Sequence, residues 1–113
     1  MHELALTEGI INIINSEAEK QNFSKVQEIT LSVGEFSGIV PQCILEFFPI
    51  AAAGSIAEDA EIVINTIPAE FKCLDCGFEG DINRSEACCP RCGSVSIKMT
   101  KGREFFVENL KVD

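Results

Sequence analysis

Two short cysteine segments constrain the fold of this chain more than any other feature of its sequence. Residues 73–77 and 89–93 both follow the pattern Cys-x-x-Cys-Gly. Each segment places two thiolates on one tight turn, and two such turns complete a tetrahedral shell of four sulfurs around a single ion. Gly77 and Gly93 have no Cβ, so the chain can adopt positive φ and turn backbone N–H groups towards the sulfurs. We therefore expect a metal-stabilised lobe.

The repeated pattern also selects four of the six cysteines as metal ligands. Cys88 in place of Cys89 would need a three-residue spacer and would lose the alignment of the following proline and glycine. We predict Cys88 to be a spare thiol beside the site, and Cys43, in an apolar segment, to be a small core residue. A closed shell of four thiolates leaves no position for water or substrate, so we expect a structural zinc. Its predicted ligands are Cys73, Cys76, Cys89 and Cys92.

The rest of the chain has the periodicity of two helices. Residues 4–20 carry apolar side chains at the spacing of an amphipathic helix. Its predicted core stripe consists of Leu6, Ile10, Ile13 and Ile14, widened by Leu4, Ile11 and Ala18. A second helix is predicted from Pro41 to Gly54, with a kink at Pro49, which removes one intrahelical donor. Its apolar face is supplied by Ile44, Leu45, Phe47 and Phe48.

Three segments have the character of strands. Residues 27–34 alternate between polar and apolar side chains, with Ile29, Leu31 and Val33 on the buried face. Residues 60–67 and 104–112 are rich in β-branched and aromatic residues. Because the second helix links the first two strands, we expect them to be parallel neighbours joined by a right-handed crossover.

These elements predict an α+β fold, in which two helices cover a small three-stranded sheet. Residues 1–70 and 101–113 would form the α+β domain. Residues 71–100 would form an inserted, zinc-ribbon-like lobe, because the apolar pattern there gives way to cysteine, glycine and charged residues. With 113 residues, the chain is long enough for one compact domain and a small appendage.

Composition excludes several classes of partner and activity. The formal net charge of −9 and the pI near 4.5 oppose binding to nucleic acid and to anionic membrane surfaces. The first twenty residues lack the basic opening of a signal peptide, and no apolar run is long enough to span a bilayer. We therefore expect a cytoplasmic protein with reduced thiols. The chain has one histidine, no phosphate-binding loop of the Walker type and no cofactor fingerprint, so no candidate base or nucleophile stands out.

The single histidine is the second residue, in Met1-His2-Glu3. An α-amino group, the next backbone nitrogens and an imidazole can form a square of nitrogen donors, which suits Ni(II) or Cu(II). Position alone favours a functionally silent terminus. Histidine is too large for the aminopeptidase that removes initiator methionine, so we expect Met1 to remain. The Glu3 side chain could complement the helix dipole or join the metal shell, and we weigh these roles equally.

With both sites considered together, the chain resembles the HypA/HybF family of nickel metallochaperones. The resemblance rests on the Met1-His2-Glu3 start, residues 31–41 (Leu-Ser-Val-Gly-Glu-Phe-Ser-Gly-Ile-Val-Pro), the two cysteine pairs, and Gly-Arg-Glu at 102–104. It implies nickel binding by the Met1 amine, by the backbone nitrogen and imidazole of His2, and by the backbone nitrogen of Glu3. It also implies zinc binding by the four selected cysteines. Cys88 and Pro49 fit the resemblance less well than the other residues.

The resemblance implies a delivery protein and not an enzyme, one that delivers Ni(II) for maturation of nickel-iron hydrogenase or of urease. The implied partners are a nickel-handling GTPase of the same pathway and the hydrogenase large subunit. A homodimer is compatible with the sequence, which does not determine the oligomeric state. Two alternatives share the cysteine pattern: a rubredoxin-like electron carrier and a zinc-ribbon interaction module. The long α+β segment argues against the first, and the acidic charge argues against a nucleic-acid-binding form of the second.

Overall fold

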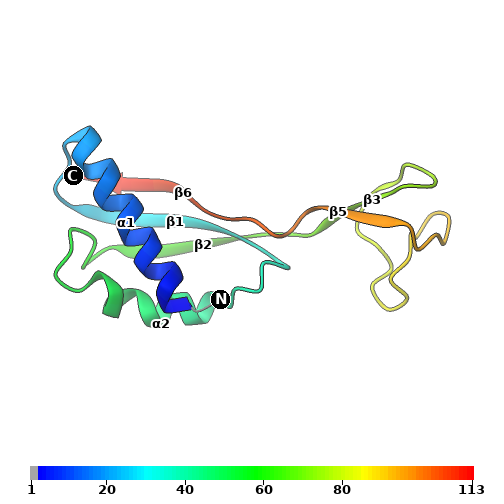
Figure 1. Cartoon of the computed structure of the whole chain (residues 1–113), viewed down its shortest axis with the longest axis horizontal. Helices are drawn as coiled ribbons and strands as arrows, with labels where there is room; N and C mark the ends of the chain where they lie inside the picture. The colour runs from blue at the N-terminus through cyan, green and yellow to red at the C-terminus, as the bar shows by residue number, and fades with distance from the viewer. Residues whose placement is uncertain (1–2) are drawn as a thin grey trace.

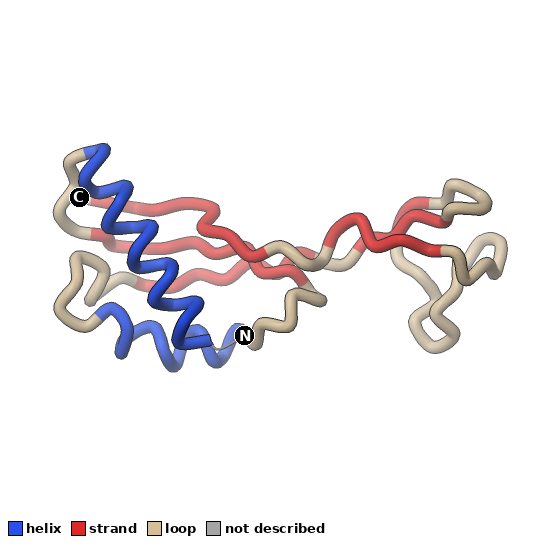
Figure 2. Tube along the Cα trace, in the orientation of Figure 1, coloured by secondary structure: helices blue, strands red, loops and turns tan. Residues whose placement is uncertain are grey.

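A computed structural model of the protein describes residues 3–113, with the Glu3 side chain outside the description. The elements are α1 (Glu3–Gln21), β1 (Val26–Gly34), α2 (Pro41–Ala52), β2 (Glu61–Ile67), β3 (Glu70–Cys73), β4 (Glu79–Gly80), β5 (Ile97–Lys101) and β6 (Phe105–Val112). They form two regions joined end to end, with overall dimensions of 53 × 26 × 18 Å (Figures 1 and 2). We call residues 3–70 and 101–113 the body, and residues 71–100 the lobe.

The body is built on a three-stranded sheet in the order β2-β1-β6. β1 pairs with β2 in parallel and with β6 antiparallel, which confirms the predicted parallel pairing of the first two strands. Both helices lie on one face of this sheet (Figure 1). The other face is left open within the described residues. There the Ser32 hydroxyl and the Asn65 amide both donate hydrogen bonds to the Glu108 carboxylate.

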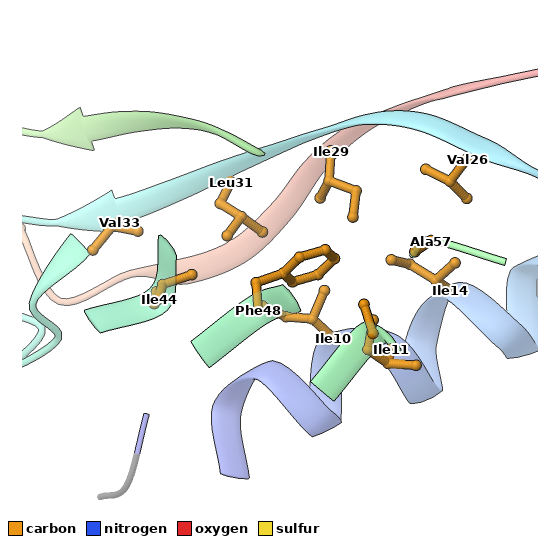
Figure 3. Close-up of a cluster of buried hydrophobic side chains, with 11 residues drawn as sticks. Ile10, Ile11, Ile14, Val26, Ile29, Leu31, Val33, Ile44, Phe48 and Ala57 are labelled. Carbon is orange, nitrogen blue, oxygen red and sulfur yellow. The ribbon is translucent and has the colours of Figure 1, made fainter. Parts of the chain in front are cut away.

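The core lies between the two helices and β1 (Figure 3). β1 buries Ile29, Leu31 and Val33 completely or almost completely, as its alternation predicted. Burying an isoleucine- or leucine-sized side chain is worth about 1.5–3 kcal/mol, so this cluster is a large favourable contribution to the stability of the body. Its buried members are Ile10, Ile11, Ile14, Val26, Ile29, Leu31, Val33, Ile44, Phe48, Ala52 and Ala57.

The predicted core stripe of α1 is correct in part. Ile10, Ile11 and Ile14 are buried, but Ile13 is 53% exposed and Leu4 is also exposed. The buried stripe includes Thr7 instead, and its hydroxyl donates a hydrogen bond to the Leu4 carbonyl over 2.8 Å, so the polar atom is satisfied. The buried face of the helix is therefore rotated slightly from the predicted one, with Thr7 inside it and Ile13 outside it. Ile13 lies on its flank, beside β6.

α2 also differs from the prediction in its buried face. Ile44, Phe48 and Ala52, at every fourth position, are buried, whereas Leu45 is exposed and Cys43 is only half-buried. The prediction that Cys43 and Leu45 belong to the core is thus wrong, because α2 packs on α1 and the sheet along one narrow stripe. The helix begins at Pro41, as predicted, and runs past Pro49 to Ala52.

The lobe contains a second three-stranded sheet, which the sequence did not predict. Its strand order is β4-β3-β5, and all of its pairings are antiparallel. The strands are short, and only Phe71, Cys73 and Cys89 are buried among residues 71–100. Too few alternating positions were present for a pattern to indicate them. In the described part of the chain, neither helix has the length and apolar character to cross a membrane.

Candidate metal centre

The two Cys-x-x-Cys-Gly segments fold into the same turn. In the first, the Gly77 N–H donates to the Cys73 carbonyl over 3.0 Å, and in the second the Gly93 N–H donates to the Cys89 carbonyl over 2.9 Å. Both glycines have φ of 78°, which favours a residue without a Cβ. The N–H of each leading cysteine also donates to a carbonyl five residues later over 2.8 Å. The two halves of the motif are therefore equivalent in conformation as well as in sequence.

This folding brings four thiols together. The sulfurs of Cys73, Cys76, Cys89 and Cys92 all lie within 4.8 Å of one another. The Cys73 and Cys92 sulfurs are 3.5 Å apart, and those of Cys76 and Cys89 are 3.7 Å apart. A tetrahedral zinc with bonds of about 2.3 Å separates its sulfur ligands by about 3.8 Å. The arrangement thus fits a single ion at its centre.

The electrostatics of the cluster also favour a cation. The hydrogen bond from the Cys76 backbone N–H is the main cause that lowers the pKa of the Cys73 thiol, to about 6. Although the Ser94 N–H acts in the opposite direction, the three neighbouring thiols and the partial loss of solvent that they cause raise the pKa of Cys92, an exposed residue, to about 12. Four thiolates so close together repel one another, so full deprotonation needs a positive ion between them.

Cys88 lies outside this cluster. Its sulfur is 3.9 Å from a carboxylate oxygen of Glu86, and its backbone pairs with Asn83 in an isolated bridge. The cluster contains Cys89 instead, which is the arrangement that the repeated motif predicts. Cys88 is half-buried, so it is a neighbour of the site and not one of the four clustered thiols.

The predicted nickel-binding segment falls mostly outside the structure. Met1 and His2 lie outside the described residues, and Glu3 is described only through its backbone, as the first residue of α1. The nickel site therefore remains a prediction.

The junction between body and lobe contains a contact that the sequence did not indicate. Arg84 of the lobe binds both carboxylate oxygens of Glu35, which follows β1, and one of these contacts measures 3.0 Å. Glu35 also accepts a hydrogen bond from the Ala69 N–H over 2.9 Å. The Arg84 guanidinium lies 5.3 Å from the centre of the Phe36 ring, which meets Phe71 edge to face at 6.4 Å. These contacts tie the lobe to the end of β1.

The backbone segments around Gly34 and Gly102 also lie close together at the junction. A Cβ on Gly34 would lie 2.3 Å from the Gly102 carbonyl oxygen, so a side chain has no room there. The Phe36 N–H donates to the Gly102 carbonyl, and the Gly102 N–H donates to the Glu104 carboxylate. Two of the sequence stretches that carry the family resemblance, residues 31–41 and 102–104, thus meet at this junction.

The body and the lobe differ in formal net charge. The lobe carries four basic and four acidic residues, so its formal charge is zero and the whole excess of nine negative charges lies on the rest of the chain. The charged residues of the lobe are Lys72, Arg84, Arg91, Lys98, Asp75, Glu79, Asp81 and Glu86. The negative field of the body raises the local concentration of cations around it.

Comparison with known proteins agrees with this arrangement. A family model described as "Hydrogenase/urease nickel incorporation, metallochaperone, hypA" matches residues 1–112. A hydrogenase maturation factor HypA of Methanocaldococcus jannaschii is 39% identical over 121 aligned positions, covering 100% of this chain and 98% of that protein. A HypA of Caldanaerobacter subterraneus subsp. tengcongensis is 35% identical, with both chains covered completely.

Solved structures show the same fold. The solution structure of the nickel metallochaperone HypA from Helicobacter pylori matches with a TM-score of 0.72 at 24% identity, covering 99% of this chain and 97% of that one. A second solution structure of a HypA protein matches with a TM-score of 0.74 at 22% identity, covering 99% and 96%.

A sheet covered by two helices, joined to a lobe with four clustered cysteines, is the architecture of a small metal-handling protein. A rubredoxin-like electron carrier has the cysteine turns but no α+β body. The extent of the sequence match narrows the class further. The chain belongs to the HypA family of metallochaperones and hydrogenase maturation factors.

Proposed function

We propose that this protein carries Ni(II) and delivers it for the maturation of nickel-iron hydrogenase, with urease as the alternative acceptor. The observation that carries this proposal is the match of the nickel-incorporation family over residues 1–112, which leaves almost no part of the chain outside it. Full-length relatives bear the name hydrogenase maturation factor, which favours hydrogenase as the acceptor. The role is delivery of a metal ion and not catalysis.

The lobe holds a structural zinc in this proposal. Its ligands are Cys73, Cys76, Cys89 and Cys92, whose sulfurs already lie at distances suited to one tetrahedral ion. When bound, zinc neutralises part of the thiolate charge and closes the lobe. A shell filled by four protein ligands has no open position for exchange, so the transported nickel belongs at a different site.

Nickel is bound at the start of the chain in this proposal. The Met1 amine, the backbone nitrogen and imidazole of His2, and the backbone nitrogen of Glu3 provide the square of nitrogen donors. Glu3, whose backbone nitrogen is one of these proposed donors, is the first residue of α1. The negative charge of the body supports it further, because that field attracts a divalent cation. Delivery involves a nickel-handling GTPase and the hydrogenase large subunit, in the cytoplasm.

Metal analysis of untagged protein, before and after nickel addition, tests both sites together. We expect one zinc and one nickel per chain. A variant with one extra glycine before Met1 should lose most of its nickel affinity, because the amine is displaced from its chelate ring, and His2→Ala should do the same. Both variants should keep zinc, which provides the control for folding.

The pH dependence separates the two metals. Amine and imidazole bind metal only when deprotonated, and their ordinary pKa values are about 7.7–8.0 and about 6.5. Nickel should therefore dissociate as the pH falls from 8 to 6, while the four-thiolate zinc remains. Retention of nickel in the glycine-extended variant and in His2→Ala would place the ion elsewhere and would contradict the proposed site.

A further inference from the structure

The four clustered thiols of the lobe differ in their access to solvent. Cys73 and Cys89, which lead the two cysteine turns, are buried. Cys76 is half-buried, and Cys92 is exposed. The lobe projects away from both helices, so neither helix covers these sulfurs (Figure 1). A small oxidant in solution therefore meets Cys92 first and Cys76 second.

Backbone N–H groups hold the two buried sulfurs in place. The Cys76 N–H donates a hydrogen bond to the Cys73 sulfur over 3.4 Å. In the second turn, the Arg91 N–H donates to the Cys89 sulfur, also over 3.4 Å. Each buried sulfur is therefore fixed inside its own turn.

Two sulfur contacts cross from one turn to the other. The exposed Cys92 sulfur lies 3.5 Å from the buried sulfur of Cys73. The half-buried Cys76 sulfur lies 3.7 Å from the buried sulfur of Cys89. Each accessible sulfur thus has a buried sulfur of the other turn as its neighbour, and sulfurs at these separations need only a small movement to form a bond.

We propose that the lobe is a redox switch, in which hydrogen peroxide expels zinc and forms two disulfides that cross between the turns. The bonds link Cys73 with Cys92, and Cys76 with Cys89. The switch rests on the structural zinc of the proposed function. With zinc bound, all four sulfurs are thiolates, so accessibility determines which of them reacts with the peroxide first.

Each disulfide forms in two steps. The Cys92 thiolate attacks one oxygen of the peroxide, becomes a sulfenic acid and releases hydroxide. The Cys73 thiolate then attacks the sulfenic sulfur, the sulfur–sulfur bond forms and a second hydroxide leaves. In each pair one peroxide is reduced and two thiolates are oxidised, and the hydroxides take up protons to become water. Zinc dissociates because a disulfide sulfur no longer carries the negative charge that binds the ion.

Disulfides between the turns would replace zinc as the link that joins them. The loop of residues 77–88, which carries Arg84, lies between Cys76 and Cys89, so the second disulfide keeps this loop closed. Arg84 therefore stays within reach of Glu35 in the body. Disulfides within each turn would instead leave the two turns unconnected. The oxidised lobe is thus free of zinc but still folded.

Oxidation of the untagged, zinc-loaded full chain tests this inference. Zinc is measured first, and excess hydrogen peroxide is then added over a time course in the presence of a zinc-binding dye. We expect the chain to release all of its bound zinc and to form the disulfide at Cys92 before the one at Cys76. Mass spectrometry of peptides identifies the pairing, because cleavage before aspartate and after arginine places the four clustered cysteines on separate peptides.

Two zinc-free states provide the matched comparison. The peroxide-treated chain should keep its amide protection over residues 71–100. A chain from which a chelator removes zinc under reducing conditions should lose that protection, and hydrogen exchange measures both states. The variant Cys88→Ser should release zinc as the wild type does, since the Cys88 sulfur lies outside the cluster, 3.9 Å from a Glu86 carboxylate oxygen.

Retention of zinc under excess peroxide overturns the inference, as do disulfides within a single turn, or sulfinic acids without disulfides. It is also overturned if Cys88→Ser abolishes zinc release, or if the amides of the oxidised lobe exchange as fast as those of the chelator-treated one. A chain that contains no zinc before peroxide is added would contradict both the proposed zinc site and this switch. Zinc that is present and survives the peroxide would contradict the switch alone.

Discussion

The body and the lobe each contain a three-stranded sheet, but they are stabilised by different physical means. The body buries eleven hydrophobic residues in one cluster between its sheet and two helices. Among residues 71–100 only three side chains are buried, and two of them are the thiols of Cys73 and Cys89. A segment with so little apolar burial gains little to offset its loss of chain entropy, so we expect its fold to depend on a bound metal ion.

The two regions also differ in charge and in the kind of contact that joins them. All of the excess negative charge lies outside the lobe, which is neutral. The junction is made by an ion pair, an aromatic pair and close backbone contacts instead of a continuous core. The comparison therefore predicts two stability units that can be perturbed separately.

Loss of the metal centre should give the largest effect, and it should be confined to the lobe. Cys73→Ser removes one of four clustered thiols, and zinc binding in small zinc-finger peptides is worth about 10–16 kcal/mol. We expect amide protection to disappear over residues 71–100 while the thermal midpoint of the body stays unchanged. Hydrogen exchange by mass spectrometry measures both. Cys88→Ser is the control and should retain zinc, and loss of zinc in that variant would show that the ligand register is wrong.

A cavity in the body core should have the converse effect. Ile14 is completely buried, so Ile14→Ala should destabilise the body by about 2–5 kcal/mol. Zinc should stay bound in the lobe, since its ligands are untouched. Urea unfolding followed by circular dichroism, with zinc released into a chelating dye, measures the two events. Ile13→Ala, one residue away on the exposed flank, should change stability by less than about 0.5 kcal/mol. Simultaneous loss of zinc with the body would contradict two separable units.

The junction backbone should give an intermediate effect. Gly34→Ala places a methyl group against the Gly102 carbonyl, and overpacking of this kind costs about 1–3 kcal/mol. Gly9→Ala is the matched control. A Cβ added at Gly9 would have no heavy atom of another residue's side chain or of a distant segment within 4 Å, and alanine is the better helix former. Thermal unfolding of the two variants should therefore shift in opposite directions. Equal thermal midpoints for the two variants would mean that the backbone at the junction accommodates the added methyl group with no loss of stability.

The ion pair at the junction should contribute least to stability and most to orientation. Glu35→Gln removes the carboxylate that holds Arg84 and the Ala69 N–H, so the lobe should reorient more freely relative to the body. Residual dipolar couplings of the zinc-loaded protein measure this freedom. Glu70→Gln, which removes an ion pair with Lys101 between the neighbouring strands β3 and β5, should leave the couplings unchanged.

The same contact predicts the response to pH. The hydrogen bond from Arg84, followed by that from the Ala69 N–H, lowers the pKa of Glu35 from 4.5 to about 2. A lowered pKa contributes stability above the ordinary value that is lost as the pH falls through the lowered one. The wild-type couplings should therefore be constant from pH 7 to pH 5. A change of orientation in that range would assign the junction to another group.

The periodic and repeated features of this chain could be predicted from the sequence. The alternation of β1 showed which of its side chains face the core, and the repeated Cys-x-x-Cys-Gly pattern identified four thiols that the structure brings together. Both patterns express local backbone geometry, in which side-chain direction repeats at a fixed interval and a turn brings near neighbours together. The helix and strand bounds followed within a few residues for the same reason.

Only the tertiary structure decided the features that depend on distant residues. Which flank of α1 is covered depends on where β6 returns, about ninety positions later in the chain, so periodicity could not distinguish Ile13 from Ile14. The pairing of Glu35 with Arg84 joins residues 49 positions apart and leaves no local pattern. The lobe strands are too short to show alternation, because their pairing follows from the two cysteine turns. Local backbone geometry depends on neighbouring residues and can be predicted from them. Contacts between distant regions form only when the folded chain brings those regions together.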